Sequence, residues 1–533
     1  MGLLDLPEEI LLLVCQRLCQ PDLYNACLTC KHLSKVAADA LYHSPYLQHL
    51  GDTGSGTSLS HTVSTNLSHA RLIRHLRFNY FHDTCETPQT ESKRQRSYDA
   101  SLVFEEQVPL LWGFIKVHCE MYSDTLALCL ILYYATRLES LMLGSVLYEI
   151  ESTTEERLTL TPFQFQDAMF FLLLKMGPKL ARPNGSSLCD RLTTIILMDP
   201  RVGETGGETD GETGGPKHDL RPFEFSADAA STLLRLPTLK TFIASDLEDD
   251  EDDEFTANER VSLQPRISNI TTLRLLNCNL SSRVIRYLLR CCKALESFHW
   301  TVTCGPFWNP EVNVVFADIW PEILYFAQSL RLLALYREPC TCEYPCTSSH
   351  IGTYDTLLPL QELQSLVLEE SGHSLEGDLY DEDDPIVDHD LQELPANIKD
   401  FVYITYGYES SDALIDEVVM ACQTRPAMRV ELCGLDPVDT TYLEKLRAKY
   451  PGFSFDLSTR RDRGLAQYCI LVRQEGRQEA ESAADAYDKI IAAAYAPYAG
   501  QAPRSRPYAT ARSCEAKLQP GLLTPKVVPR IRT

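Results

Sequence analysis

The sequence predicts an α/β chain in which a small unit of three helices precedes a long array of strand–helix repeats. Two observations predict this class. The first 45 residues carry apolar residues at helical spacing, and a short pattern, apolar-x-x-apolar-x-apolar, then recurs ten times between residues 73 and 432. Stretches with helical period separate several copies, so strand and helix should alternate once per repeat. We therefore expect a solenoid with a parallel sheet on its inner face and helices outside.

The amino-terminal segment should form three helices. Pro7 suits the first turn of a helix that we expect to reach about Cys19, and a third helix should span about 31–41. In the first helix, residues 10–14 are all apolar, so they cannot all point inward. A unit this small seldom buries enough surface to be stable alone, and the surplus apolar surface predicts a docking site.

Several short motifs in this segment occur in the order found in F-box domains: LPxEIL at 6–11, DL at 22–23, CK at 30–31 and LY at 41–42. The segment resembles an F-box, a module that binds the Skp adaptor of SCF-type (Skp/cullin/F-box) ubiquitin ligases. The resemblance implies adaptor-binding positions, which are Leu6, Pro7, Ile10, Leu11, Val14, Leu18, Leu23, Leu28, Cys30 and Leu33. The sequence departs from the family at Leu33, where many members carry an aromatic residue. The alternative is that the helices merely cap the domain behind them.

The recurring pattern is most complete at Ile270–Leu280, ITTLRLLNCNL, which fits the leucine-rich-repeat motif LxxLxLxxCxL. Helical periodicity follows at 284–289, 315–326, 414–422 and 443–450, with Ser281 as the expected cap of the first of these helices. The ten copies begin at Ile73, Leu138, Leu192, Leu239, Ile270, Leu295, Leu330, Leu363, Ile398 and Ala427. The chain thus resembles the degenerate F-box and leucine-rich-repeat proteins of filamentous fungi.

Composition divides the chain into regions. We expect an F-box at 1–45, a linker at 46–69, a leucine-rich-repeat-like solenoid at 70–458 and a C-terminal extension at 459–496. Polar, glycine-rich or acidic insertions are expected near 82–97, 201–217, 246–260, 339–356 and 372–390. Residues 497–533 are basic and rich in proline, and should be a disordered tail.

Composition also excludes some functions. The formal net charge of −25 argues against nucleic-acid binding, because phosphate would be repelled. The longest apolar run, 125–135, falls well short of the ~20 residues that cross a bilayer, so we expect no membrane association. Nineteen cysteines without a signal peptide indicate a reducing compartment, cytoplasmic and/or nuclear. Nucleophile-elbow, zinc-protease and phosphate-loop motifs are missing, which leaves a catalytic site without support from the sequence. The F-box resemblance implies a non-catalytic subunit without cofactors.

One cysteine-rich segment offers metal ligands. CTCEYPCTSSH places four candidate ligands within eleven residues: Cys340, Cys342, Cys346 and His350. Structural zinc sites favour cysteine pairs separated by two to four residues, and the first two cysteines here are closer than that. We therefore assign no metal site and interpret the segment as a thiol-rich loop, with zinc binding as the alternative.

In a solenoid, the side chains that alternate with the buried ones would face the concave surface. Candidate substrate-binding residues on that face are Arg274, His299, Tyr336, Val367 and Glu369. The expected function is that of a substrate receptor. The F-box would bind the Skp adaptor, and through it a cullin–RING ligase, while the repeats bind a protein that the sequence does not identify. The alternatives are an adaptor-bound scaffold that causes no degradation, and a metal-binding protein.

Overall fold

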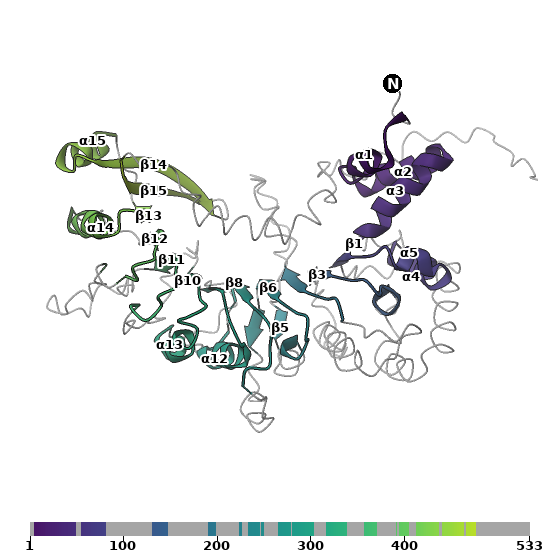
Figure 1. Ribbon diagram of the computed structural model, residues 1–533, viewed down its shortest axis with the longest axis horizontal. Coiled ribbons are helices and arrows are strands. Elements are labelled where there is room, and N and C mark those ends of the chain that lie inside the picture. The colour runs from purple at the N-terminus through teal and green to yellow at the C-terminus, as the bar shows by residue number, and fades with distance from the viewer. Residues whose placement is uncertain are drawn as a thin grey trace, which may run out of the picture.

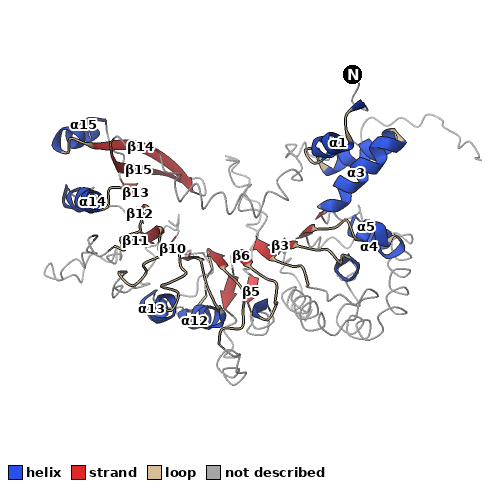
Figure 2. Ribbon diagram, in the orientation of Figure 1, coloured by secondary structure: helices blue, strands red, loops and turns tan. Residues whose placement is uncertain are grey.

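The 533-residue chain folds as a group of helices followed by a long sheet, and the elements follow one another along an open arc (Figure 1). The computed structural model describes residues 5–48, 55–81, 131–147, 190–198, 223–225, 233–245, 247–249, 265–278, 280–302, 316–337, 357–369, 391, 394–404, 412–435, 440–462 and 465–475. The strands run along the arc, and helices lie on its outer side and at its amino-terminal end (Figure 2). The expected insertions at 82–97, 201–217, 339–356 and 372–390 and the expected tail lie outside the described residues.

The three expected helices of the amino-terminal unit are present as α1 (Glu8–Cys15), α2 (Gln20–Thr29) and α3 (Lys31–His43). Helix α1 ends at Cys15, not at Cys19 as expected. After Cys15, the backbone N–H groups of Arg17 and Leu18 bond to carbonyls three residues back, which tightens the last turn. The chain then turns into α2, whose first turn holds a proline.

The expected linker at 46–69 is folded in its described parts, residues 46–48 and 55–69. They contain β1 (Tyr46–Gln48), α4 (Ser55–Thr65) and the start of α5 (Leu67–Ala70). Helix α4 is rich in Ser and Thr, yet Leu59 and Val63 lie four residues apart on its buried side. The linker prediction was wrong because the polar composition of this segment outweighs the narrow apolar stripe of α4.

The main sheet has thirteen strands. In spatial order they are β1, β2 (His75–Phe81), β3 (Ser140–Leu147), β4 (Thr194–Met198), β6 (Thr241–Ser245), β8 (Thr272–Leu276), β9 (Ser297–Val302), β10 (Leu332–Arg337), β11 (Ser365–Glu369), β12 (Asp400–Ile404), β13 (Arg429–Leu435), β15 (Leu465–Gln474) and β14 (Phe453–Asp462). From β1 to β13 every neighbouring pair is parallel, and β13–β15 and β14–β15 are antiparallel. All ten copies of the sequence pattern coincide with strands from β2 to β13.

Two expected boundaries are wrong. The boundary at 458 falls inside β14, and the expected extension at 459–496 supplies β15 to the same sheet. Phe455, Ile470 and Val472 are buried, so this hairpin continues the core and covers the edge of the parallel strands. The segment 246–260, expected to be an insertion, begins with β7 (Leu247–Asp249), which pairs with β5 (Phe223–Phe225) in a separate two-stranded sheet.

Helices cover one face of the sheet. Helices α12 (Ser282–Cys291), α13 (Phe316–Leu324), α14 (Asp412–Thr424) and α15 (Thr440–Lys449) lie on the outer side of the arc (Figure 1). They coincide with the four stretches of predicted helical periodicity. The hydroxyl of Ser281 accepts a bond from the backbone N–H of Val284 at 3.4 Å, which confirms the expected cap.

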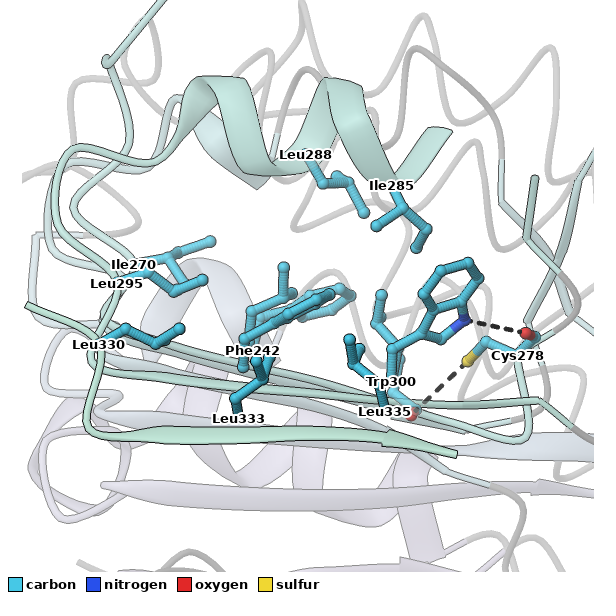
Figure 3. Packing of buried hydrophobic residues seen from close by; sticks show 14 of the residues in the cluster. Phe242, Ile270, Cys278, Ile285, Leu288, Leu295, Trp300, Leu330, Leu333 and Leu335 are labelled. Carbon is cyan, nitrogen blue, oxygen red and sulfur yellow. Dashed lines mark hydrogen bonds between the residues drawn. The ribbon is translucent and has the colours of Figure 1, made fainter. Parts of the chain in front are cut away.

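The core lies between this face and the helices. The central apolar residue of each pattern copy stands directly opposite its counterparts on the neighbouring strands. These residues form one in-register row: Leu76, Leu141, Ile195, Phe242, Leu273, Phe298, Leu333, Leu366, Phe401 and Val430. Figure 3 shows Phe242 and Leu333 of this row beneath Ile285 and Leu288 of α12.

The most complete repeat has a buried cysteine after its strand. The Cys278 thiol lies 3.9 Å from the carbonyl oxygen of Ala244, and the Cys278 carbonyl accepts a bond from the Trp300 indole at 3.3 Å (Figure 3). The backbone N–H of Cys278 donates to the Thr301 carbonyl at 2.9 Å. The cysteine thus helps to satisfy backbone groups at the turn, as the motif predicts.

Replacing the buried indole tests the importance of this core. Trp300→Ala should lower the free energy of unfolding by about 3–5 kcal/mol, because it leaves a large cavity and removes the bond to Cys278. Urea unfolding followed by circular dichroism measures the change. The matched control is Met420→Ala on α14, whose side chain is 49% exposed and should change stability by no more than about 0.5 kcal/mol. Equal midpoints for the two variants would contradict this account of the core.

Candidate functional site

The amino-terminal unit has a small core of its own. In α1, Leu11 and Cys15 point inward, and in α2, Leu23 and Ala26 do so. They pack against three small or branched residues of α3: Val36, Ala37 and Ala40. These residues recur at three- and four-residue spacing, so each helix turns only one narrow stripe toward its neighbours. Of the other apolar residues of α1 and α2, Leu12 and Cys27 are half-buried against this core, and the rest lie outside it.

Those outer residues form two apolar stripes. On α1, Ile10, Leu13 and Val14 are 43%, 58% and 40% exposed. On α2, Tyr24 and Leu28 are 59% and 68% exposed. The spacing again corresponds to one face of each helix. Large apolar side chains this exposed on so small a unit are typical of a surface that another protein covers.

The structure divides the predicted adaptor-binding residues into three groups by exposure. Pro7, Ile10, Val14 and Leu28 are exposed, as a contact surface requires. Four are half-buried: Leu6, Leu18, Cys30 and Leu33. Leu11 and Leu23 are 1% and 6% exposed and form the core of the unit, so they cannot contact an adaptor directly. Their expected role is corrected to holding the helices together.

Two exposed residues were not predicted. Leu13 and Tyr24 are among the most exposed apolar side chains of the unit. Leu13 lies in an unbroken apolar run, where the sequence alone does not say which members point outward. Helical spacing could have indicated the exposure of Leu13, because Ile10, Leu13 and Val14 share one helical face once Leu11 is assigned to the core.

Ionic and sulfur contacts position the helices. The Lys35 ammonium on α3 donates to the Glu8 carboxylate on α1 at 2.8 Å, and this bond lowers the pKa of Glu8. The Cys30 sulfur accepts from the backbone N–H of Leu33 at 3.5 Å and caps α3. Cys30 therefore has a local structural role.

The unit connects directly to the sheet. The Tyr42 ring on α3 stacks on His69 of α5, with centroids 4.4 Å apart. Immediately after α3, strand β1 pairs with β2, and the Arg77 guanidinium lies 4.7 Å from the centre of the Tyr46 ring. At the same junction, Arg74 forms an ion pair with Glu139. These contacts fix the direction in which the helical unit leaves the sheet.

The sheet face opposite the helices carries four of the predicted substrate-binding residues, Arg274, His299, Tyr336 and Val367. Arg274, Tyr336 and Val367 are half-buried, as a contact surface allows, and Glu369 is the last residue of β11. His299, however, is 1% exposed and cannot contact a partner as expected. It stands in register between Arg274 and Ala334 on the adjacent strands, and its ring lies 5.4 Å from that of Tyr336. Packing along and between neighbouring strands therefore encloses the imidazole.

Two other expectations concern the candidate zinc ligands and the absence of a membrane-spanning segment. The cysteine-rich segment at 340–350 lies outside the described residues, so its ligand geometry stays a prediction. Among the helices that the structure describes, none has the length and apolar character to cross a bilayer.

The helical unit matches one known protein family. Residues 3–48 match the family described as F-box-like, which covers α1 to α3 and β1. No curated protein shows significant similarity to the chain. The chain therefore carries an F-box-like domain, and the exposed stripes of α1 and α2 lie within it.

The junction between this domain and the sheet should respond to pH. The pKa of His75 is lowered to about 4, chiefly by burial and also by the nearby His43 and Arg74, against an opposing effect of Glu139. Because the unfolded chain then binds more protons, stability falls as pH decreases from about 6.5 toward 4. His75 alone should lower the free energy of unfolding by about 2 kcal/mol between pH 7 and pH 5.

Chemical unfolding at both pH values measures this difference. His75→Gln, which cannot be protonated, should have a smaller loss on acidification than the wild type. His61→Gln, at an exposed site on α4, is the matched control and should keep the wild-type loss. A wild-type loss that survives in His75→Gln would show that other groups cause the pH dependence.

Proposed function

We propose that the protein is a non-catalytic substrate receptor of an SCF-type ubiquitin ligase. Its F-box-like domain would bind the Skp adaptor and, through it, the cullin–RING machinery. The observation that carries this proposal is the exposure of Ile10, Leu13, Val14, Tyr24 and Leu28 on one small domain. Burying such side chains on a partner is favourable by about 25 cal/mol per Å² of apolar area removed from water.

We further infer that the sheet is an irregular leucine-rich-repeat solenoid. Three observations support this: the parallel strands follow chain order, their apolar residues are in register, and helices cover one face. The turn at Cys278 has the hydrogen bonds expected of the repeat motif. Such arrays present long surfaces to proteins, which suits substrate binding.

The substrate would contact the face opposite the helices. Half-buried Arg274, Tyr336 and Val367 offer a mixture of charge, aromatic surface and aliphatic surface there. Mixed surfaces of this kind are typical of protein interfaces. All ten described cysteines are thiols, in keeping with a cytoplasmic and/or nuclear site of action.

A second candidate function is an adaptor-bound scaffold that assembles proteins without their degradation. The same exposed stripes would serve both functions, so adaptor binding does not separate them. Inactivation of the ligase separates them, because a receptor's bound protein should then accumulate, whereas a scaffold's bound protein should not.

Charged substitutions within the stripes test adaptor binding. Leu13→Asp and Leu28→Asp should each weaken binding to purified Skp adaptor by at least about thirtyfold, because a carboxylate would be desolvated in an apolar contact. Calorimetric titration of the full-length protein measures the affinity. Both side chains are exposed, so circular dichroism should show an unchanged fold.

The matched control is Leu457→Asp on β14, the same substitution at an exposed leucine (39%) far along the chain. It should bind the adaptor as the wild type does. Wild-type affinity in both stripe variants would overturn the proposed adaptor site.

A further inference from the structure

Three potential metal ligands meet where the sheet changes from parallel to antiparallel. Cys433 on β13 stands directly opposite Cys469 on β15, and Glu431 precedes Cys433 by two residues on the same strand. Side chains two residues apart in a strand share a face, so all three lie on the side of the sheet opposite the main core. Among the residues that the structure describes, this is the one group of three or more such side chains close enough to hold an ion.

The distances suit a single small ion. The Cys469 thiol donates toward the Cys433 sulfur at 3.1 Å, and both sulfurs and a Glu431 carboxylate oxygen lie within 4.8 Å of one another. Zinc–sulfur bonds of about 2.3 Å and zinc–oxygen bonds of about 2.0–2.2 Å place neighbouring ligands within such a separation. Small side-chain adjustments would therefore bring the three atoms around one ion.

Two adjacent strands hold the ligands in place. On the β12 side, Ile404 pairs with Cys433 and Val402 pairs with Glu431. The register between β13 and β15 shifts just after Cys433, so two residues of β13 oppose one of β15. Such β-bulges redirect side chains and often lie beside functional sites.

The surroundings are apolar. Cys433 and Cys469 are 1% and 0% exposed, and they pack with Val402 and Ile404, while Tyr336 and Val367 lie at the margin. A buried thiol packs as a small apolar group and needs no carboxylate beside it. Placing a carboxylate at the edge of an apolar cluster costs free energy unless the carboxylate is hydrogen-bonded or binds a cation. A bound cation gives Glu431 a role in this position.

We propose that Glu431, Cys433 and Cys469 bind one Zn²⁺ ion. On binding, each thiol loses its proton to solvent, two zinc–sulfur bonds and one zinc–oxygen bond form, and water completes the coordination. Two thiolates and one carboxylate suit Zn²⁺ better than Mg²⁺ or Ca²⁺, which prefer oxygen ligands only. The ion ties β15 to β13 and so fixes the terminal hairpin to the parallel strands.

Cobalt substitution tests this site on the full-length protein. After treatment with a chelator under reducing conditions, the protein should bind one equivalent of Co²⁺ with a sulfur-to-cobalt charge-transfer band, and Zn²⁺ should displace it. The Cys433→Ser/Cys469→Ser double variant should lose the band. Glu431→Gln keeps both thiols and should weaken Zn²⁺ binding by at least about tenfold, since even second-shell changes have effects of that size.

Two matched controls distinguish this site from other cysteines. Cys291→Ser/Cys292→Ser removes another buried pair, whose pKa values burial raises to about 11 and 12, and should keep the band. Cys340→Ser/Cys342→Ser/Cys346→Ser should also keep it, which excludes the cysteine-rich segment as the source.

Thiol protection gives a readout that needs no variant. In the native wild-type protein, Zn²⁺ should slow alkylation of Cys433 and Cys469 at least about tenfold, as peptide mass spectrometry would show, and leave Cys19 unchanged. Absence of a charge-transfer band in the wild type would overturn the proposal, as would a band that survives in the double variant. A Cys433–Cys469 disulfide that forms in place of metal binding would also overturn it, and would assign the pair to redox chemistry.

Discussion

The fold depends on one constraint, the in-register stacking of apolar side chains along the parallel strands. No strand of this array can bury its apolar face alone, because its neighbours on either side complete the same row from Leu76 to Val430. Side chains alternate between the two faces of a strand, so a slip of one residue would turn a strand's apolar set away from the helices. The regular pattern therefore fixes the register of the strands, while the number of residues that connect one strand to the next can vary.

This constraint explains what could be predicted from the sequence. Ten copies of a pattern that directly encodes burial predicted ten strands, and Ser281 with the apolar stripe behind it predicted α12. Two elements behind the amino-terminal helices that do not follow the repeat pattern were not predicted. Helix α4 shows only a narrow stripe within a polar segment, and the β14–β15 hairpin does not follow the repeat pattern.

The candidate sites were predicted less completely, because they depend on tertiary contacts. Periodicity marks Leu11 and Leu13 as equally apolar, and only the position of α3 decides that Leu11 is inside. His299 was expected to be accessible, but residues on the adjacent strands enclose it. Cys433 and Cys469 are far apart in the chain, and nothing local signals that the antiparallel hairpin brings their sulfurs within 3.1 Å.

The direct connection between the helical unit and the sheet bears on how a receptor of this kind would work. Strand β1 begins three residues after α3 ends, and its pairing with β2 and the Tyr42–His69 stack leave no free segment between them. An adaptor bound to α1 and α2 would therefore be held in one orientation relative to the first strands. A tethered domain would sample many orientations, and a protein bound to the sheet would meet the ligase at a lower effective concentration. Folding of residues 46–48 and 55–70 would thus hold the two proposed binding surfaces in one fixed arrangement.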